Sequence, residues 1–413
     1  MSDNTTDEPK DTTPDEPTSV PQNEPAQAGG TTPEPTGEPA PAEGSAQDEV
    51  LVESNADLDT PKGISRRKLL TGAAIGAGVI AGGTWFLLRS TKNDNQTANG
   101  LTVTESWADR ELALTAPSGV CEAPLIIAHE KGFFEEAGLN VVLRKTGDDE
   151  DVTAAVGSGT YVASNGIFFN YLGPIYNGTP VKLSGGLHYG CLDLYVRNDG
   201  SVPTLVDLRD RRIGVSSLQG SATNYFSLDL LDVGINSSPE AGEVEWVVIE
   251  QDLLPEALQS EQVDAIATAG GFLPIIQGVQ DGWALQLSSN NAALGQSQNA
   301  DQPCCAVALN NTFVEQDPVT AAALVNAWSE AARWVGQNIE ETAEIESSKD
   351  YVPGTPEEIV DILRTLTFEP SPSNLREVLA PGIAKYKETG FLPADVDVEA
   401  LADLVFVDLG LNY

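Results

Sequence analysis

The sequence predicts an α/β protein whose folded part is large enough for two lobes. Short apolar runs alternate with amphipathic stretches from about residue 112 onward, a pattern typical of βα units and a mainly parallel sheet. This part of the chain holds about 300 residues, near the size at which one hydrophobic core stops growing and the chain divides. No internal repeat stands out.

The expected elements are short strands that alternate with helices. The first strand spans residues 112–116, ends in Pro117-Ser118-Gly119, and precedes a helix at 123–137 with Gly138 as its cap. Further strands are expected at 139–143, 181–183, 192–197, 212–216, 244–249, 263–267 and 306–309, and further helices at 222–233, 254–260 and 318–337. The last helix has apolar residues at helical spacing from Ala321 to Ala332, which predicts a buried face. The tail from residue 353 onward is predicted to form helices on the first lobe.

The first 63 residues differ in composition from everything that follows. They contain 15 Asp or Glu, 2 Lys, 10 Pro and no aromatic residue. Such a segment cannot bury enough apolar surface to offset the entropy of ordering it, so we expect it to be disordered and extended. It is interpreted as a solvated leader, a long signal n-region or a cytoplasmic tail.

Residues 64–89 have the charge and hydropathy of an export signal. Arg66 and Arg67 stand directly before an uncharged run, as in a twin-arginine signal for export of folded proteins. Leu69 and Thr71 depart from the residues usual at those places. The apolar run 69–88 has about the length needed to cross ~30 Å of hydrocarbon, so an ordinary membrane anchor is the alternative. Either reading places the protein outside the cytoplasm, tethered through residues 69–88, with the twin-arginine machinery as a partner under the first reading. Residues 90–108 are expected to be a linker.

The charge of the chain excludes some partners. The net charge is −40, of which residues 1–63 contribute 2 − 15 = −13, so residues 64–413 carry −27. This sign disfavours nucleic acids and anionic membrane surfaces.

Four segments resemble one known family, in the expected order. The run 123–141 (APLIIAHEKGFFEEAGLNV) resembles the opening helix of ABC-transporter substrate-binding proteins of the nitrate/sulfonate/thiamine-pyrimidine group. The runs 204–215 (TLVDLRDRRIGV) and 257–265 (ALQSEQVDA) are similar to later segments of that group, and 306–309 with Asp317-Pro318 is similar to its return strand and long helix. Each segment alone is a weak signal.

The resemblance implies a two-lobed periplasmic-binding-protein-like fold of type II, each lobe a mixed sheet flanked by helices. Lobe 1 would span 109–198 and 304–413, lobe 2 would span 199–303, and crossing strands would lie near 196–201 and 303–306. The implied function is that of a non-catalytic receptor without a cofactor, which closes on a small solute and delivers it to an ABC permease. Pyrimidine-precursor synthases resemble the same group, so an enzyme that uses His188 and Cys191 is an alternative. A membrane-tethered sensor is a third, weaker reading.

Ligands of open α/β sheets bind beyond the carboxyl ends of the strands, and five loops lie at such ends. Within them the candidate ligand-binding residues are Ser118, Cys121, Ser164, Asn165, His188, Gln219, Gly220, Ser221, Ala222, Thr223 and Gly270. The turn 217–223 could hold an anion on free backbone N–H groups, whereas the simpler interpretation of 221–223 is a helix start with a Ser cap.

His188 and the cysteines allow several interpretations. His129 is expected on the surface, whereas His188 lies in a Gly-flanked loop before Cys191. Cys191, Cys304 and Cys305 stand at apolar strand positions, which favours buried thiols or a disulfide of Cys191 with Cys304 or Cys305. Contact with a ligand, or a metal or metal-chelate site of His and thiolates, remains open, and export of a folded protein would suit a loaded metal.

The chemistry of the ligand also stays open. The acidic run 148–151 is interpreted as the charged first turn of a helix that begins at Val152, where carboxylates suit the helix dipole. At a cleft the same charges would favour a cation or amine over nitrate or a sulfonate. Phe168, Phe169 and Tyr171 could stack on a flat heterocycle, although their spacing is more typical of core residues.

Overall fold

The computed structural model describes residues 106–117, 119–147 and 150–411, and the fold is described for these alone. The predicted leader 1–63, the export signal 64–89, the linker up to residue 105, and Ser118 lie outside the described residues. In the described part of the chain, no helix is long and apolar enough to span a membrane.

The first sheet has five strands in the order β2-β1-β3-β10-β4. Their bounds are β1 (Glu111–Thr115), β2 (Asn140–Arg144), β3 (Ala163–Ile167), β4 (Val181–Gly186) and β10 (Cys305–Asn310). β1 pairs in parallel with β2 and β3, and β10 runs antiparallel between β3 and β4.

The second sheet repeats this plan in the order β7-β6-β8-β5-β9. Its strands are β5 (Leu192–Arg197), β6 (Arg212–Val215), β7 (Glu245–Val248), β8 (Ala265–Ala269) and β9 (Ala284–Ser289). β6 pairs in parallel with β7 and β8, and β5 runs antiparallel between β8 and β9. In each sheet four of the five strands therefore run in the same direction, as the expectation of a mainly parallel sheet implies, and only the strand that arrives from the other sheet, β10 or β5, runs against its neighbours. Two mixed sheets are what the resemblance implied.

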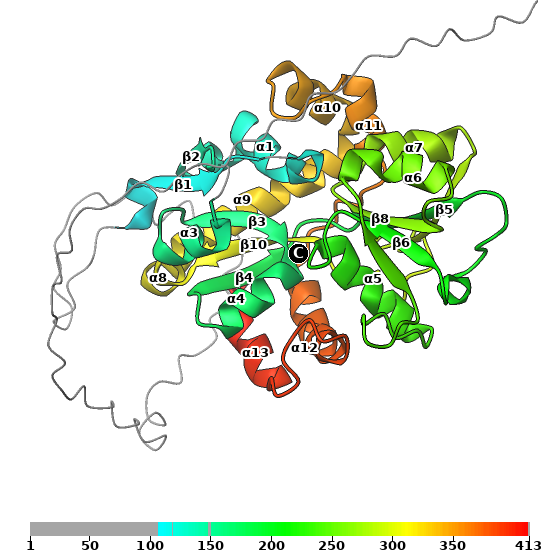
Figure 1. Cartoon of the computed structure of the whole chain (residues 1–413). Helices are drawn as coiled ribbons and strands as arrows, with labels where there is room; N and C mark the ends of the chain where they lie inside the picture. Colours follow the sequence, from blue (N-terminus) through cyan, green and yellow to red (C-terminus); the bar gives the residue numbers. More distant parts are fainter. Residues whose placement is uncertain (1–105, 118, 148–149, 412–413) are drawn as a thin grey trace, which may run out of the picture. The chain divides into compact units, whose positions relative to one another are not determined.

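The helices flank both sheets (Figure 1). The helices that precede β10 in the chain are α1 (Ala123–Glu130), α2 (Phe133–Glu136), α3 (Val152–Ser158), α4 (Leu172–Tyr176), α5 (Ser221–Asp232), α6 (Leu254–Gln259) and α7 (Leu273–Gln280). Those after β10 are α8 (Asn311–Gln316), α9 (Pro318–Gln337), α10 (Ile339–Ser348), α11 (Pro356–Leu363), α12 (Pro372–Glu388) and α13 (Val398–Val405). Short 3-10 turns lie at η2 (Trp107–Asp109), η3 (Val120–Glu122), η4 (Phe168–Tyr171), η5 (Leu205–Leu208) and η6 (Gln251–Leu253).

Local sequence explains where several helices begin and end. The helix expected at 123–137 is divided into α1 and α2, because Gly132 between them takes a left-handed φ of 78° that most side chains avoid. α9 matches its predicted bounds, since Asp317 accepts a hydrogen bond from the N–H of Thr320 and Pro318 suits the first turn. Asp151 caps α3 in the same way and accepts from the N–H of Ala154, as the acidic run indicated.

Alternate residues of the second sheet pack into different cores. On β8, Ile266 joins a small core with residues of α6 and α7, whereas Ala265 and Ala267 join the main core. On β5, Tyr195 joins the small core and Leu194 joins the main core. Helices therefore cover both faces of this sheet, as the period of two along a strand requires.

Three chain segments pass between the sheets. The first leads from β4 to β5 through residues 187–191, earlier than the expected 196–201, because Leu192–Arg197 already pairs within the second sheet. The return passage ends at β10, close to where it was predicted. The third passage is residues 364–371, where Tyr189 and Thr367 exchange backbone hydrogen bonds and Gly186 and Ser371 do the same.

The helices of the tail lie on both sides of the third passage. α12 and α13 follow it and pack on β4 of the first sheet, as predicted. α11 precedes it and packs mainly on α10, which lies on α1 and α9 of the first lobe, as predicted. α11 also contacts α7, a helix of the second sheet.

Candidate functional site

A pocket of about 230 Å³ lies at the carboxyl ends of β1 and β3. Its lining comes from the ends of these strands, from the start of α3 and from the η4 turn. The lining residues are Thr115, Ala116, Glu122, Thr146, Val152, Thr153, Asn165, Gly166, Ile167, Asn170 and Tyr171. The edge of the sheet is the one at which ligands of open α/β sheets bind.

Asn165 is the pocket residue that most strongly indicates a ligand, because its buried amide lacks hydrogen-bond partners among the described residues. It is 9% exposed, and neither its Nδ2 nor its Oδ1 has a hydrogen-bond partner among the described residues. A buried amide without a partner loses its hydration without compensation, which costs about 1–3 kcal/mol. A solute that both donates and accepts a hydrogen bond would remove this cost.

The rest of the pocket combines polar and apolar side chains, and its described lining residues include no cationic side chain. Hydroxyl groups of Thr115, Thr146 and Thr153 line it, and no Lys, Arg or His is among its described lining residues. The carboxylate of Glu122 accepts a hydrogen bond from the N–H of Gly119 at 3.2 Å. The pocket therefore suits a neutral or cationic polar solute better than an anion.

The start of α5 lies beside this pocket. The Nδ2 of Asn170, in the pocket lining, donates a hydrogen bond of 3.0 Å to Oγ of Ser221, the first residue of α5. Asn170 follows a strand of the first sheet, and α5 packs on β5 and β8 of the second. This contact connects residues of the two sheets at the edge of the pocket.

The other residues predicted around Ser221 have local roles. The hydroxyl of Thr223 donates to the carbonyl oxygen of Ser217 at 2.6 Å, and Ala222 is buried. Gly220 is the N-cap, and the carbonyl oxygen of Gln219 accepts from the side chain of Asn224. These four residues fit the interpretation of a helix start, but the expected Ser cap is wrong, because Gly220 is the N-cap and Ser221 is the first residue of the helix.

Ser164 lies behind the pocket rather than in its wall. Its hydroxyl is buried and lies 3.2 Å from the hydroxyl of Tyr171, which lines the pocket. Phe168 and Phe169 are both buried, and Phe169 contacts the rings of Tyr386 and Phe391. The two phenylalanines belong to the core, so they are not a stacking platform for a heterocycle.

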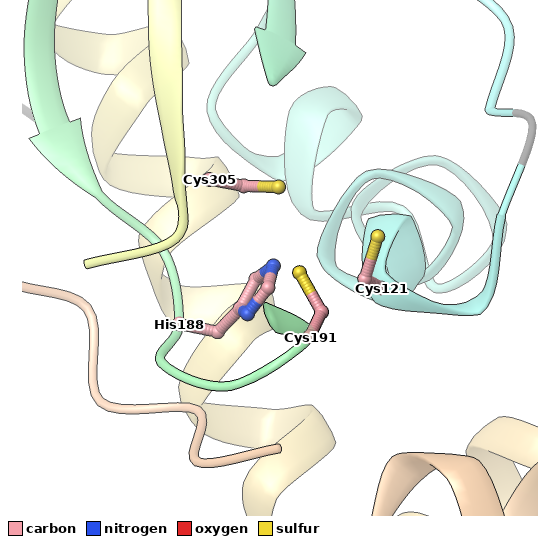
Figure 2. Close-up of side chains that lie close together, drawn as sticks. All are labelled: Cys121, His188, Cys191 and Cys305. Atoms are coloured by element: carbon pink, nitrogen blue, oxygen red, sulfur yellow. The ribbon is translucent and has the colours of Figure 1, made fainter. Parts of the chain in front are cut away.

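Two predicted residues, Cys121 and His188, form a second site with Cys191 and Cys305. The three Sγ atoms and one imidazole nitrogen lie within 4.8 Å of one another, and Figure 2 shows the four side chains pointing toward a common centre. His188, Cys191 and Cys305 are buried, and Cys121 is half-buried. Gly270, also predicted, donates its N–H to the carbonyl oxygen of Cys191 at 2.8 Å, so it supports this group and is absent from the pocket lining.

The thiols of this group influence one another. Hydrogen bonds from Cys191 and Cys305 hold the pKa of the Cys121 thiol well below its usual value, and the same bonds raise the pKa of the two donors. All four cysteines are free. The disulfide expected between Cys191 and Cys304 or Cys305 is therefore wrong for this structure, in which the sulfur atoms gather around one point instead of in pairs.

Sequence reasoning missed much of the pocket, and for this second site it left a metal site of His188 and thiolates open beside the interpretation as buried thiols or a disulfide. Thr115 and Asn170 carry no motif, and only their places after a strand could have indicated them. Cys191 and Cys305 were assigned to the core because both stand in apolar runs. No spacing rule connects Cys121 to Cys305 across the length of both lobes.

Solved structures of substrate-binding proteins share this fold. The nitrate-binding protein NrtA from Synechocystis PCC 6803 is 20% identical, with a TM-score of 0.53 over 72% of this chain and 85% of its own. The aliphatic sulphonate-binding protein SsuA from Escherichia coli is 13% identical, with a TM-score of 0.57 over 70% and 96%. A ligand-binding component of an ABC-type import system from Staphylococcus aureus, solved with zinc bound, is 14% identical, with a TM-score of 0.53 over 72% and 97%.

These likenesses establish a periplasmic-binding-protein-like fold, and a family comparison goes further. No curated protein sequence matches this chain significantly. The model of the NMT1/THI5-like family matches residues 122–342, which is more than half of the chain. The matched range includes the elements from α1 to α9 and the start of α10, both sheets apart from β1, and most of both sites. The chain therefore belongs to the NMT1/THI5-like family.

Proposed function

We propose that this protein is an extracytoplasmic receptor of an ABC importer that captures a small solute in the pocket beside Asn165. The observation that carries the proposal is the buried amide of Asn165 at the carboxyl ends of β1 and β3, which has no hydrogen-bond partner in the described part of the chain. The fold supports it, because two neighbours with the same fold bind nitrate and sulfonate. The two sheets serve as lobes 1 and 2, and closure of α5 over the pocket is the signal that the permease reads.

The chemistry of the pocket differs from what an anion requires. Without a described Lys, Arg or His in the lining, and with Glu122 present, a nitrate or sulfonate ion would gain little electrostatic attraction. The volume of about 230 Å³ lies below that of sites for drug-sized ligands, ~300–1,000 Å³. The proposed solute is therefore a small, neutral or cationic molecule with both hydrogen-bond donors and acceptors.

The localisation and the remaining partners belong to the same proposal. A receptor for an importer works outside the cytoplasm, which agrees with the arginine pair and apolar run at residues 64–89. We propose export through the twin-arginine machinery and a tether at residues 69–88. We also propose that the lobe bounds lie near those predicted from the sequence. The first crossing is the exception, because it lies at residues 187–191.

An enzyme that uses His188 and Cys191 is the second candidate. The two residues do lie in one group of donor atoms within 4.8 Å. Both side chains are buried, at 0% and 1% exposure, and neither lines the pocket described above. A substrate in that pocket would not reach them, so the arrangement favours a receptor over this enzyme.

A thermal-shift screen of the purified full-length protein tests the proposal. The panel contains neutral pyrimidines and amides, polyamines and quaternary amines, nitrate, and alkanesulfonates. We expect at least one neutral or cationic compound to raise the melting temperature, because a ligand of the native state stabilises it. Stabilisation by sulfonates alone would contradict the assigned chemistry, and no stabilisation by any compound would contradict the receptor.

Asn165→Ala is the variant that connects the screen to the pocket. We expect it to weaken binding of the compound found by about tenfold or more, which corresponds to the loss of one or two hydrogen bonds. Asn326→Ala is the matched control, because Asn326 lies half-buried on α9, outside the pocket lining, and donates to Glu330. Equal losses of affinity in the two variants would place the solute elsewhere.

A further inference from the structure

Cys121, His188, Cys191 and Cys305, here named the Cys3His group, come from three segments of the chain that meet at the passages between the sheets. Cys121 lies on η3 before α1, and Cys305 is the first residue of β10. His188 and Cys191 lie on the first passage, which leads to β5. The described lining of the Asn165 pocket includes none of the four, so the group is a separate site.

The donor set is one that metals prefer. Three thiolates and one imidazole form the Cys3His set of closed, tetrahedral zinc sites. Zn–S bonds of about 2.3 Å place neighbouring sulfur atoms about 3.8 Å apart in a tetrahedron. The donor atoms of the Cys3His group already lie within 4.8 Å of one another, so a contraction of about 1 Å reaches metal-binding distances.

The imidazole of His188 is oriented to donate its lone pair to this centre. Its Nδ1 lies 3.4 Å from the carbonyl oxygen of Tyr189, while its Nε2 is buried without a partner among the described residues. A ring that directs Nδ1–H at a backbone carbonyl has its Nε2 free to bind a metal, the usual arrangement of metal-bound histidine. The ring of Phe368 packs against His188 at 5.6 Å between centroids and limits its rotation.

Backbone hydrogen bonds fix the places from which the ligands project. The N–H of Cys304 donates to the carbonyl oxygen of His188, and the N–H of Leu187 donates to that of Cys305, each at 2.8 Å. Cys191 has a left-handed φ of 72°, a conformation that costs about 1–2 kcal/mol for a residue with a side chain. A residue held in such a conformation by its neighbours is typical of functional sites.

We propose that the Cys3His group binds one thiophilic divalent cation of the zinc class. The site is closed, with four protein ligands and no open position, so the metal has a structural role at the passages between the sheets. Half-buried Cys121 is the ligand at which the ion enters and leaves. The proposal is independent of the solute, because the two sites share no residue.

Zinc titration of the full-length, reduced and metal-stripped protein tests this inference. We expect one equivalent of Zn²⁺ to bind in competition with a chromophoric chelator, with release of thiol protons. Co²⁺ in its place should give a tetrahedral spectrum with thiolate charge-transfer bands. A protein that binds no equivalent of Zn²⁺, or a Co²⁺ spectrum without thiolate bands, would overturn the proposal.

Two cysteine variants provide a matched comparison. We expect Cys121→Ser to weaken Zn²⁺ binding by about 100-fold or more and Cys304→Ser to change it by less than about threefold. Cys304 is a buried neighbour of Cys305, and its sulfur is not among the four grouped atoms. Equal losses in both variants would contradict the assignment.

Two further measurements separate a lost ligand from a damaged fold. A chelator should lower the melting temperature of the wild-type protein and leave that of Cys121→Ser unchanged, because the variant no longer holds the metal. The variant itself should fold, because Cys121 lies on a half-buried turn that tolerates serine. Asn165→Ala should retain the wild-type affinity for Zn²⁺, so failure of the solute proposal and failure of this one are distinguishable. A chelator without effect on the wild-type protein would argue against a bound structural metal.

Discussion

The backbone N–H of Cys304 donates a hydrogen bond of 2.8 Å to the carbonyl oxygen of His188, which joins the chain leaving the first sheet to the chain returning to it. His188 belongs to the first passage, and Cys304 precedes β10. The same bond brings the imidazole of His188 near the thiol of Cys305. The connection between the sheets and the proposed metal site are therefore one structural unit.

Gly190, the glycine of the first passage, is predicted to be hard to replace by a residue with a side chain. It has a φ of 95°, and a Cβ at this position would lie 2.7 Å from the carbonyl oxygen of Thr365 in the third passage. Gly190→Ala should lower the free energy of unfolding by about 2–4 kcal/mol, from backbone strain and from this collision. Urea unfolding measures the change.

Gly178→Ala is the control for this prediction. Gly178 has a similar φ of 98°, but nothing lies within 4 Å of the position of its Cβ. Gly178→Ala should lower the free energy of unfolding by only about 1 kcal/mol, which is the contribution of backbone strain alone. If the two variants lose the same stability, the close approach of the first and third passages does not exist in solution.

Glu346 is predicted to make the stability depend on pH. It lies buried on α10, and neither of its carboxylate oxygens has a partner among the described residues. Burial, and secondarily the negative charges of Cys121 and Glu122, raises the pKa of Glu346 from 4.5 to about 9. The folded state therefore keeps a proton that the unfolded state releases, and stability falls as pH rises from about 4.5 to about 9.

Glu346→Gln should remove this part of the pH dependence. The variant should match the wild-type protein near pH 4 and exceed its free energy of unfolding by about 3 kcal/mol at pH 7. Glu344→Gln, at an exposed position of the same helix, is the control and should change little. Parallel pH profiles for wild type and Glu346→Gln would show that the carboxyl group is not held in a dry environment.

Asn310 is predicted to be a strong structural contributor at the end of β10. Its Oδ1 caps α8 by accepting from the N–H of Phe313, and its Nδ2 donates to the carbonyl oxygens of Val156 and Gly157. Asn310→Ala loses three hydrogen bonds, although the carbonyl oxygen of Val156 still accepts from the N–H of Gly159, and should cost about 2–4 kcal/mol. The half-buried neighbour Asn311, changed to Ala, should cost less than about 0.5 kcal/mol in the same unfolding experiment.

The contact between Asn170 and Ser221 reports how the sheets approach at the pocket. A double-mutant cycle with Asn170→Ala and Ser221→Ala should give a coupling of about 0.5–1 kcal/mol in the free energy of unfolding. Addition of the solute found by the thermal-shift screen should increase this coupling, because closure brings α5 to the pocket. Zero coupling with and without the solute would mean that this contact plays no part in closure.

The sequence predicted the elements best where local signals agree with tertiary packing. β5 (Leu192–Arg197) and α9 (Pro318–Gln337) have the predicted bounds, because a continuous apolar run and a capped, periodic helix are both local features. β9 (Ala284–Ser289) was missed, since its alternation is short and weakly apolar. The first crossing was misplaced because no local signal tells in which sheet a strand pairs.

The candidate sites depend on contacts that no local signal carries. The rule about strand ends pointed to Asn165, although Asn165 lies within β3 and not in a loop after it. His188 was predicted from its Gly-flanked loop, and its three sulfur partners are brought to it only by the fold. The sequence favoured buried thiols or a disulfide of Cys191 with either Cys304 or Cys305, and only the fold shows that Cys305 joins the group while Cys304 does not.

The exchange of hydrogen bonds between Tyr189 and Thr367, and between Gly186 and Ser371, has a mechanical consequence. Bending at one connection would have to break bonds to the connection beside it, so all three bend together as a short ribbon. A ribbon of three backbones resists shear much more than twist, which leaves rotation about its long axis as the softest movement. Residues 364–371 thus stiffen the connection between the two sheets. Cleavage of the chain before Thr367 should allow relative movements of the sheets that the intact molecule restricts.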